Sequence, residues 1–453
     1  MNASIFKTYD IRGIYPTEIN EQNVFKIAQA LARVLKPKTI ALGRDVRLSS
    51  PQLWEAAKEG LLKAGVRVID IGTISTDMLY FAVAHFGLDG GITITASHNP
   101  KEYNGMKIVG KNSAPIFQDY LLPEIEKIAT DPNFIADNLP GGELQKLDVL
   151  TEYIQKVRSF IDLKNFSPTK ILINANFGLA GQIFKKILVT APIEWVELNC
   201  EPDGNFPKGR PDPLIPESRE ETKKTIREQG ANIGFAWDAD ADRCFIYDEN
   251  GQDIEGCFMG ALLAKIILQK NFDSEPRIVY DPRIVWTLAE TIKKFGGVPI
   301  PSKVGHAVIK SSMRQENALA ALESSGHFYF RDFFFCDNGM ISALLILDYL
   351  NKEKIKLSEA LASFTDKYFV SGEINFVAEN KDEIIEEIKQ KYNDGQFEEI
   401  DGLSIAYSDW RFNLRKSNTE PLLRLNIETR KAGLLEEKRE ELVRLIETLR
   451  IPR

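Results

Sequence analysis

The stretch ITITASHNP, residues 92–100, joins a strand pattern to a polar loop. Ile92 and Ile94 alternate with threonines, which is the two-residue period of a β-strand. The Asn-Pro pair that follows favours a loop and places Ser97 just beyond the end of that strand. Ligands in α/β sheets bind beyond the carboxyl ends of strands. We therefore expect a ligand site around Ser97.

Strand and helix patterns alternate on both sides of this loop. Upstream, apolar residues at helical spacing predict a helix that starts at a Ser50 cap, has Pro51 at its first position and stops at Gly65. A strand at 66–71 and a helix at about 77–86 are expected next. The same patterns recur downstream, with strands expected at 171–174, 232–237 and 277–280 and helices at 180–188, 338–350 and 382–392.

The length of 453 residues suggests three or four domains, at roughly 100–150 residues each. Three units with alternating strands and helices precede one unit of different character, which ends in a charged helix. This order predicts an α/β protein. We place the expected domains at residues 1–150, 151–252, 253–365 and 366–453.

Composition and charge argue against several classes of protein. A net charge of −8 does not suit a nucleic-acid binder, which needs a basic surface to neutralise phosphates. The four cysteines form no CxxC pair, so neither a zinc site nor a disulfide framework is indicated. The N-terminus lacks a signal-peptide pattern, and the apolar run 341–347 is too short to cross a bilayer. These features predict a cytoplasmic enzyme without nucleic-acid or membrane partners.

A second candidate site is the sequence DADADR, residues 238–243. Asp238, Asp240 and Asp242 supply hard oxygen ligands in one short loop, which suits Mg²⁺ or Ca²⁺. A solvated acidic turn is the alternative. An EF-hand is rejected because its loop requires glycine where this chain has Arg243, and because a strand pattern rather than a helix follows. We expect Arg243 to position the metal loop or a phosphate.

The residues around Ser97 permit two interpretations. A serine after a strand can be an exposed nucleophile, and His98 supplies a titratable neighbour. Most Ser-His pairs in loops are turn formers or caps, so local evidence leaves both interpretations open. The Gly-x-Ser-x-Gly pattern of hydrolases is absent, and a hydrolase nucleophile is therefore not supported.

Two further loops carry groups that could bind a sugar phosphate. The segment ESSGH, residues 323–327, offers a carboxylate, hydroxyls and an imidazole for sugar hydroxyls. The segment RKSNTEP, residues 415–421, offers charge, hydroxyls, an amide and turn N–H groups, which suit a phosphate dianion, and Arg424 follows shortly after. A capped turn could equally explain the first segment, and a solvated basic turn the second.

Together and in this order, these segments resemble those of the α-D-phosphohexomutases, most closely the bacterial and archaeal phosphomannomutase/phosphoglucomutase group. The resemblance extends over nearly the whole chain. The segments that carry it are YDIRG at 9–13, TASHNP at 95–100, YNGMK at 103–107, DADADR at 238–243, ESSGH at 323–327 and RKSNTEP at 415–421.

The resemblance implies three similar mixed-sheet α/β domains and a distinct C-terminal α+β domain around one central cleft. It implies an isomerase that interconverts hexose 6-phosphate and hexose 1-phosphate, of mannose or glucose, through phospho-Ser97 and a hexose 1,6-bisphosphate. Asp238, Asp240, Asp242 and a phospho-Ser97 oxygen would hold one Mg²⁺ per chain, and the bisphosphate would also serve as activator. The expected partners are small sugar phosphates, and the chain is expected to be a monomer or a weak homo-oligomer.

The resemblance also implies roles for single residues. Lys107 is favoured for proton transfer, because a lysine that is desolvated and flanked by cations can lose its proton. Arg12, His98 and His327 are further candidates for this role. The implied substrate-binding residues are Tyr9, Arg243, Arg283, Gly305, His306, Glu323, Ser325, His327, Arg415, Ser417, Asn418 and Thr419.

The chain departs from the usual pattern of this family at three positions, and a fourth is a position that varies within the family. Ala239 and Leu322 stand where glycine is frequent, Arg283 stands where lysine is frequent, and Ser324 occupies the variable position of the sugar loop. Ala239 should be tolerated unless its φ is positive. The departures leave the preferred sugar open, so phosphoglucosamine mutase stays a candidate. A phosphatase and a non-catalytic sugar-phosphate-binding homologue also stay open.

Overall fold

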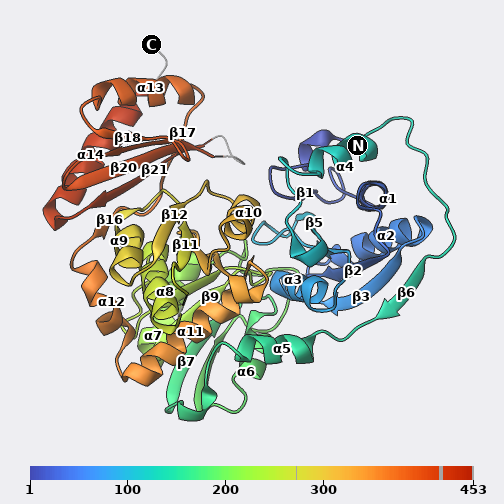
Figure 1. The fold of residues 1–453 in the computed structure, drawn as a ribbon, viewed down its shortest axis with the longest axis horizontal. Helices are drawn as coiled ribbons and strands as arrows, with labels where there is room; N and C mark the ends of the chain where they lie inside the picture. The colour runs from blue at the N-terminus through green and yellow to red at the C-terminus, as the bar shows by residue number, and fades with distance from the viewer. Residues whose placement is uncertain (272, 418–421, 451–453) are drawn as a thin grey trace. The chain divides into compact units, whose positions relative to one another are not determined.

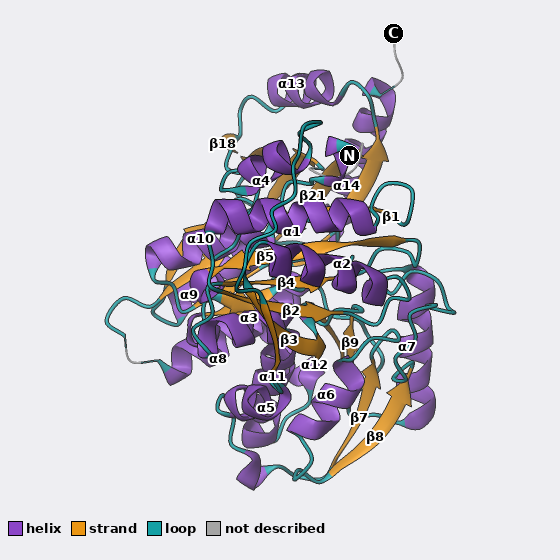
Figure 2. Ribbon diagram, turned by 90° about the vertical axis from the view of Figure 1, so that its right-hand side faces the viewer, coloured by secondary structure: helices purple, strands orange, loops and turns teal. Residues whose placement is uncertain are grey.

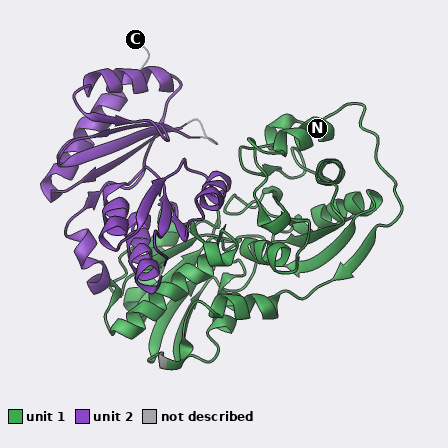
Figure 3. Ribbon diagram, viewed as in Figure 1, with its two compact units in different colours: residues 1–254, 326–357 green, residues 255–325, 358–453 purple. Residues whose placement is uncertain are grey.

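The structure is a computed structural model that describes residues 1–271, 273–417 and 422–450. The chain forms two compact units, drawn in green and purple in Figure 3. The first unit comprises residues 1–254 and 326–357, and the second comprises residues 255–325 and 358–453. No helix among the described residues is both long and apolar enough to cross a membrane.

The first unit begins with a six-stranded sheet of order β1-β5-β4-β2-β3-β6. Its strands are β1 (Ile11–Ile14), β2 (Thr39–Arg44), β3 (Arg67–Thr73), β4 (Gly90–Ile94), β5 (Tyr103–Gly110) and β6 (Glu143–Lys146). The sheet is mixed, because β4 runs parallel to β2 and antiparallel to β5. Its helices are α1 (Glu21–Leu35), α2 (Ser50–Lys63), α3 (Thr76–His85) and α4 (Leu122–Ala129).

Helices cover both faces of this sheet (Figures 1 and 2). Ile92 of β4 packs into a core that also contains apolar residues of α1, α2 and α4. The neighbouring Gly91 faces α3, and an added Cβ there would lie 2.6 Å from Val83. The alternation expected for residues 92–95 thus continues to Gly91, where a small residue lets α3 approach the strand.

The start of α2 differs from the expected cap. Ser49 rather than Ser50 is the N-cap residue, so Pro51 is the second residue of the helix and not the first as expected. The Ser50 hydroxyl donates instead to Asp45 Oδ1 at 2.6 Å, because a buried carboxylate lies within its reach. The helix ends before Gly65, whose φ of 78° is a conformation that favours glycine.

A second sheet of order β10-β9-β7-β8 follows in the same unit. Its strands are β7 (Thr169–Asn174), β8 (Ile193–Leu198), β9 (Ile233–Trp237) and β10 (Cys244–Tyr247), with helices α5 (Leu150–Arg158), α6 (Ala180–Ile187) and α7 (Pro216–Gln229). Gly234 of β9 faces Ile226 of α7, whereas Phe235 packs against Phe184 of α6 with ring centroids 5.6 Å apart. This sheet too has helices on both faces. The antiparallel pair β14 (Phe328–Phe330) and β15 (Cys336–Asp337) and helix α11 (Gly339–Glu353) complete the first unit.

The second unit contains a parallel group and an antiparallel sheet. Strand β11 (Arg277–Tyr280) lies between β12 (Val298–Pro301) and β13 (Ala320–Leu322), parallel to both. Helices α8 (Gly256–Lys270), α9 (Trp286–Lys294) and α10 (His306–Glu316) accompany these strands, and the chain returns to this unit within α12 (Leu357–Thr365).

The C-terminal part of the second unit has a different architecture. Its antiparallel sheet has the order β16-β21-β20-β19-β18, and β17 also pairs with β21. The strands are β16 (Phe369–Val370), β17 (Ile374–Val377), β18 (Gln396–Glu398), β19 (Leu403–Ala406), β20 (Trp410–Lys416) and β21 (Leu422–Thr429), and the helices are α13 (Lys381–Lys391) and α14 (Ala432–Leu449). Both helices pack on the sheet around one apolar core. The expectation of a distinct C-terminal α+β domain is confirmed.

Glu428 of β21 joins the antiparallel sheet to α9. Its carboxylate accepts hydrogen bonds of 2.9–3.0 Å from the amides of Val285, Trp286 and Thr287 and from the Thr287 hydroxyl. An anion at a helix N-terminus satisfies amides that have no partner within the helix. Arg411 lies 3.7 Å from the same carboxylate, and both side chains are buried.

We expect Glu428→Gln to destabilise the second unit by about 3–5 kcal/mol, because it leaves Arg411 buried without its charged partner. Differential scanning calorimetry should show a lower unfolding temperature. Glu437→Gln, at a side chain that is 65% exposed, is the matched control and should unfold with the wild type. An unchanged unfolding temperature in Glu428→Gln would contradict this account of the junction.

Candidate active site

Ser97 lies in the loop between β4 and β5, as the strand pattern predicted. Its φ of 50° is uncommon for a residue other than glycine, and its amide donates to Thr95 Oγ1 at 2.9 Å. Its Oγ lies 3.0 Å from His98 Nδ1 and donates to Asp238 Oδ2 at 3.0 Å. The fold therefore brings together the serine loop and the acidic loop, although 141 positions separate these two residues.

Arg47 fixes the backbone of this loop. The guanidinium is buried, pairs with Asp45 at 3.2 Å and lies 4.9 Å from the ring centroid of Phe206. Its NH groups donate to four carbonyl oxygens of the loop, those of Ser97, Asn99 and Pro100 at 2.7 Å each and that of Tyr103 at 3.1 Å. One side chain thereby satisfies four carbonyls of an irregular buried segment, which would otherwise cost free energy.

The acidic loop connects β9 to β10 and is buried throughout. Arg243 donates to Asp238 Oδ2 through Nε at 2.9 Å and approaches it through Nη2 at 2.8 Å. Burial nevertheless raises the pKa of Asp238 above its ordinary value. Ala239, the departure from the glycine frequent at this position, does not have a positive φ, whereas Ala241 does, at 61°. The expectation that alanine is tolerated at position 239 is confirmed.

Lys107 of β5 pairs with the other two carboxylates of the loop. Its Nζ donates to Asp240 Oδ2 at 2.7 Å and also to Asp242 Oδ2. Burial alone would lower the pKa of Lys107, but the two carboxylates outweigh burial and raise it above its ordinary value. For Asp240, burial would raise the pKa, but Lys107 and a hydrogen bond from Thr76 hold it below its ordinary value. The neighbours of Lys107 are thus anions as well as the cations expected from the sequence.

The donor set of this loop fits a hard divalent cation. One carboxylate oxygen from each of Asp238, Asp240 and Asp242 lies within 4.8 Å of the others. Asp240 Oδ1 and Asp242 Oδ1 are buried and accept no hydrogen bond within the described part of the chain. Buried carboxylate oxygens without donors are the ligands that Mg²⁺ prefers, and the Ser97 hydroxyl lies beside them.

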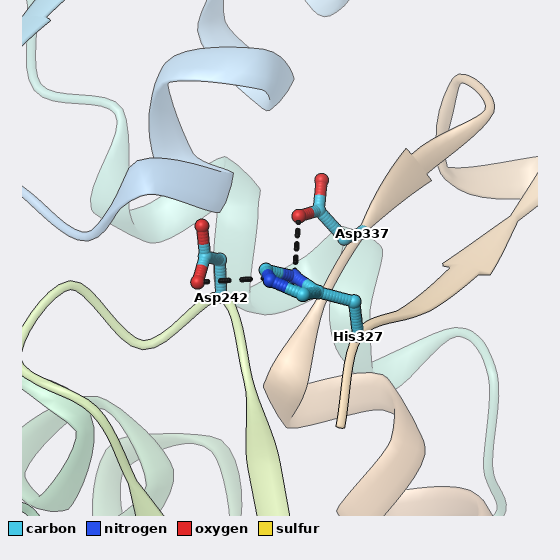
Figure 4. A group of neighbouring side chains, drawn as sticks. All are labelled: Asp242, His327 and Asp337. Carbon is cyan, nitrogen blue, oxygen red and sulfur yellow. Dashed lines mark hydrogen bonds and ion pairs between the residues drawn. The ribbon is translucent and has the colours of Figure 1, made fainter. Parts of the chain in front are cut away.

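His327 is held beside the acidic loop by a second carboxylate. Its Nδ1 lies 3.0 Å from Asp337 Oδ2 and 3.9 Å from Asp242 Oδ1. Figure 4 shows the imidazole between the two aspartates. An Nδ1–H donated to Asp337 leaves the lone pair on Nε2, which suits proton transfer.

Of three more predicted residues, His98 belongs to the Ser97 loop, and Arg12 and Tyr9 lie in or just before β1. Arg12 of β1 pairs with Asp10 at 2.6 Å and donates to Asn99 Oδ1 at 2.7 Å, so it reaches the Ser97 loop. Burial lowers the pKa of His98 well below its ordinary value, and nearby arginines add to this effect. His98 is therefore neutral at physiological pH. Tyr9 is half-buried just before β1.

The second unit gathers the predicted third-domain residues around Asp281. Arg283 donates to both oxygens of Asp281, at 3.0 and 2.9 Å, and to Glu323 Oε1 at 3.3 Å. The Ser324 amide donates to the same Asp281 at 2.6 Å, so one buried carboxylate holds Arg283 and the sugar loop together. Ser325 Oγ has no hydrogen-bond partner among the described residues although it is buried. Gly305 and His306 form the N-cap and first residue of α10.

Arg415 lies near the end of β20, opposite Arg424 of β21. It donates to Glu373 Oε2 at 3.0 Å, and its Nε lies 3.9 Å from Asp401. Ser417 donates its amide to the carbonyl of Leu422 at 2.9 Å. The predicted phosphate ligands Asn418 and Thr419 lie outside the described residues.

Four residues that organise these sites were not predicted from the sequence, namely Arg47, Asp281, Asp337 and Glu373. Arg47 follows β2 closely, and this position at the carboxyl end of a strand is the one signal that could have indicated it. Asp337 and Glu373 carry no local signal, because their partners lie in other elements.

Comparisons with known proteins agree with the fold. Four successive stretches match phosphoglucomutase/phosphomannomutase domains: residues 3–135, 151–251 and 255–368 match alpha/beta/alpha domains I, II and III, and residues 373–445 match the C-terminal domain. A phosphomannomutase of Vibrio cholerae is 43% identical over 98% of this chain and 99% of its own length. A protein of Xanthomonas campestris called phosphohexose mutases is 42% identical, over 98% of this chain and 100% of its own length.

Among solved structures, a phosphoglucomutase/phosphomannomutase family protein of Burkholderia thailandensis has a TM-score of 0.88 and 29% identity. The match covers 99% of this chain and 98% of that one. The fold and the site therefore define a sugar-phosphate mutase, an isomerase that acts by phosphoryl transfer. The chain belongs to the α-D-phosphohexomutase family, as its sequence motifs indicated. Its three α/β domains and distinct C-terminal domain are those of the family, in which use of magnesium is typical.

We expect Asp240→Asn to weaken Mg²⁺ binding by about ten- to a hundredfold, because a charged ligand group contributes about 1.5–3 kcal/mol. Isothermal titration of the protein with Mg²⁺ measures this loss directly. Asp332→Asn, at a surface carboxylate that is 75% exposed, is the charge-matched control and should bind like the wild type. Equal affinity in Asp240→Asn would remove the acidic loop from metal binding.

Proposed function

We propose that this chain interconverts hexose 6-phosphate and hexose 1-phosphate, of mannose or glucose, through a phosphoryl group carried on Ser97. The observation that supports this proposal most directly is the position of Ser97 Oγ, 3.0 Å from Asp238 Oδ2 and next to a neutral His98. A hydroxyl at the edge of a potential cation site is where a phosphoryl carrier is expected. The four domains, proposed at residues 1–150, 151–252, 253–365 and 366–453, each contribute one of the segments involved.

In the first half of the reaction, the resting enzyme carries phosphate on Ser97. O1 of hexose 6-phosphate attacks the phosphorus, the O1–P bond forms and the bond from P to Ser97 Oγ breaks. The O1 proton passes to a base, and Oγ receives a proton from an acid. The product is hexose 1,6-bisphosphate.

Asp238, Asp240, Asp242 and a phospho-Ser97 oxygen would hold Mg²⁺, which when bound supplies positive charge beside the transferring phosphoryl group. Arg243 holds Asp238 in place through two contacts. Arg47 keeps the Ser97 loop in one backbone conformation through its four carbonyl contacts. Both arginines therefore preorganise the reacting groups before the substrate binds.

In the second half, the bisphosphate turns over end for end and returns its other phosphate to Ser97. The sugar must then be recognised in two orientations. Glu323 and Ser325 suit this role, since a carboxylate and a buried hydroxyl can bind O3 and O4 in either orientation. The phosphate that is not transferred would rest on Arg415, with Ser417, Asn418 and Thr419 as further ligands.

The reaction needs a protonated side chain as general acid and a deprotonated side chain as general base. The carboxylates around Lys107 hold its proton in place, so we propose that Lys107 first acts as an acid rather than as a base. His98 and His327 have ring nitrogens that can accept a proton. Arg12 donates to the carbonyl of Ala96 and so places a positive charge beside the Ser97 loop. Tyr9, Arg283, Gly305 and His306 would complete the contacts to the sugar phosphate.

A coupled assay that compares kcat/KM for mannose 1-phosphate, glucose 1-phosphate and glucosamine 1-phosphate would identify the preferred sugar. The similarity to proteins named phosphomannomutase favours mannose, and the match to phosphoglucomutase/phosphomannomutase domains keeps glucose as a candidate. A clear preference for glucosamine 1-phosphate would assign the chain to the phosphoglucosamine mutases instead.

We expect Ser97→Ala to lose at least about 10⁴-fold in kcat, as removal of a nucleophile does in other enzymes. The wild type incubated with a hexose 1,6-bisphosphate should gain one phosphate in intact mass, and the variant should gain none. Ser159→Ala, at an exposed serine, serves as the control and should behave as the wild type. Near-normal turnover in Ser97→Ala would exclude the phosphoserine mechanism.

Arg415→Ala should raise KM more than it lowers kcat, because the contact to the untransferred phosphate exists before and during the transition state. A charge-assisted contact contributes about 1.5–3 kcal/mol, so kcat/KM should fall by roughly ten- to a hundredfold. Activity should also depend more strongly on added hexose 1,6-bisphosphate, since the intermediate would escape more often. Arg439→Ala, at an exposed arginine, provides the comparison. An unchanged KM would show that Arg415 is not a phosphate ligand.

A further inference from the structure

Three arginines of the second unit converge on the carboxylate of Glu373. Arg415 Nη2 lies 3.0 Å from Oε2 and Arg424 Nη1 lies 3.1 Å from Oε1. Arg283 approaches Oε2 through Nη1 at 3.7 Å. Both oxygens of one carboxylate are thus shared among three guanidinium groups.

This convergence needs an anion. Arg415 and Arg424 are directly opposite residues of the antiparallel strands β20 and β21, an arrangement in which like charges repel. Glu373 precedes β17, which pairs with β21, so the backbone brings its carboxylate to this pair of cations. Without a substrate, Glu373 supplies the negative charge that lets the arginines stay close together.

The carboxylate also lies where a phosphate would bind. Arginines recognise carboxylates and phosphates through the same planar arrangement of N–H groups. The proposed function places the untransferred phosphate on Arg415, the residue that Glu373 contacts most closely. Glu373 and a substrate phosphate would therefore compete for the same donors.

The neighbouring acids are less suited to leave. Asp281 is fully buried and holds Arg283 through two hydrogen bonds, so Arg283 keeps its place when Glu373 moves. The Glu373 side chain is 27% exposed and can turn toward water. Among the carboxylates around these arginines, the exposed Glu373 can be exchanged at the lowest desolvation cost.

We propose that Glu373 is an exchangeable counter-anion of the phosphate site, which occupies the arginines until a substrate phosphate displaces it. This inference rests on the proposed function, which assigns the phosphate to Arg415. Displacement weakens the net affinity for phosphate. A hexose phosphate adds sugar contacts that offset this loss, whereas inorganic phosphate has no such contacts and binds poorly.

The exchange also suits the turnover of the intermediate. A bisphosphate that must reverse its orientation has to release the phosphate from these arginines in every cycle. Release into water would take from Arg415 the anion at its Nη2 group, at a cost in electrostatic free energy. Return of the Glu373 carboxylate replaces the departing phosphate and lowers that cost.

The test is the affinity for inorganic phosphate, measured by isothermal titration calorimetry on the full chain. Glu373→Gln keeps the shape of the side chain and removes its charge, so the dissociation constant for phosphate should fall by about tenfold. Glu379→Gln removes the same charge from an exposed glutamate on the same domain and should bind phosphate as the wild type does. An unchanged or larger dissociation constant in Glu373→Gln overturns the proposal.

Two further variants separate this inference from the proposed function. Arg415→Ala should weaken phosphate binding; if it does while Glu373→Gln changes nothing, only the role of Glu373 is wrong. If Arg415→Ala binds phosphate normally, the phosphate site itself is wrong and the inference fails with it. Glu373→Asp, which keeps the charge on a shorter side chain, should give an intermediate affinity and serves as the test if the glutamine variant does not fold. Wild-type affinity in Glu373→Asp together with weaker binding in Glu373→Gln would indicate a structural role and overturn the exchange.

Discussion

Three buried carboxylates in one six-residue loop impose the main constraint on the first unit. Asp238, Asp240 and Asp242 repel one another, and burial removes the water that would screen them. Two cations compensate this repulsion: Arg243 from the loop itself pairs with Asp238, and Lys107 from β5 of the other sheet pairs with Asp240 and Asp242. The three carboxylates outnumber these two cations, so the site keeps a net negative charge. A net negative charge favours the binding of a divalent cation beside Ser97. The position of β5 next to the acidic loop therefore serves two purposes. It packs the strand, and it brings the Lys107 ammonium group to the carboxylates of Asp240 and Asp242.

The second unit shows the same principle with the charges reversed. Arg283, Arg415 and Arg424 form a positive site, and buried acids fix only part of it. Asp281 holds Arg283 from one side, while Arg411 donates to the carbonyls of Pro282 and Arg283 at 3.1 and 2.9 Å. Glu428 in turn anchors Arg411 and the start of α9. The position of Arg283 thus depends on residues of the antiparallel sheet, which makes that sheet part of the site's support.

The sequence predicted what depends on local pattern and could not predict what depends on long-range contacts. The alternation around Ile92, the helix stop at Gly65 and the acidic loop follow from residues close in the chain, and the structure contains all three. Arg47 and Glu373 act on partners that only the tertiary fold brings near, so no spacing rule indicates them. The Ser50 cap was wrong for a local reason: the buried Asp45, five residues upstream, accepts the hydrogen bond of the hydroxyl. Lys107 was identified as a site residue, but its charged neighbours on the acidic loop, and hence its protonation state, required the fold.

The site around Ser97 and the arginine site of the second unit differ in how firmly their charged side chains are held. The difference fits the proposed tasks of the two sites, phosphoryl transfer at the first and binding and release of a phosphate at the second. The groups around Ser97 are buried and tied by several contacts each, which suits chemistry that must occur in one geometry. The arginines of the second unit contact buried acids, such as Asp281 at Arg283, and the more exposed acid Glu373. A phosphate site that bound its ligand with fully uncompensated arginines would hold the bisphosphate too tightly to let it reverse. A site whose cations were fully and permanently paired would not bind it at all. A carboxylate that can be displaced, as proposed for Glu373, would lie between these limits and would let the same arginines bind and release phosphate in every cycle.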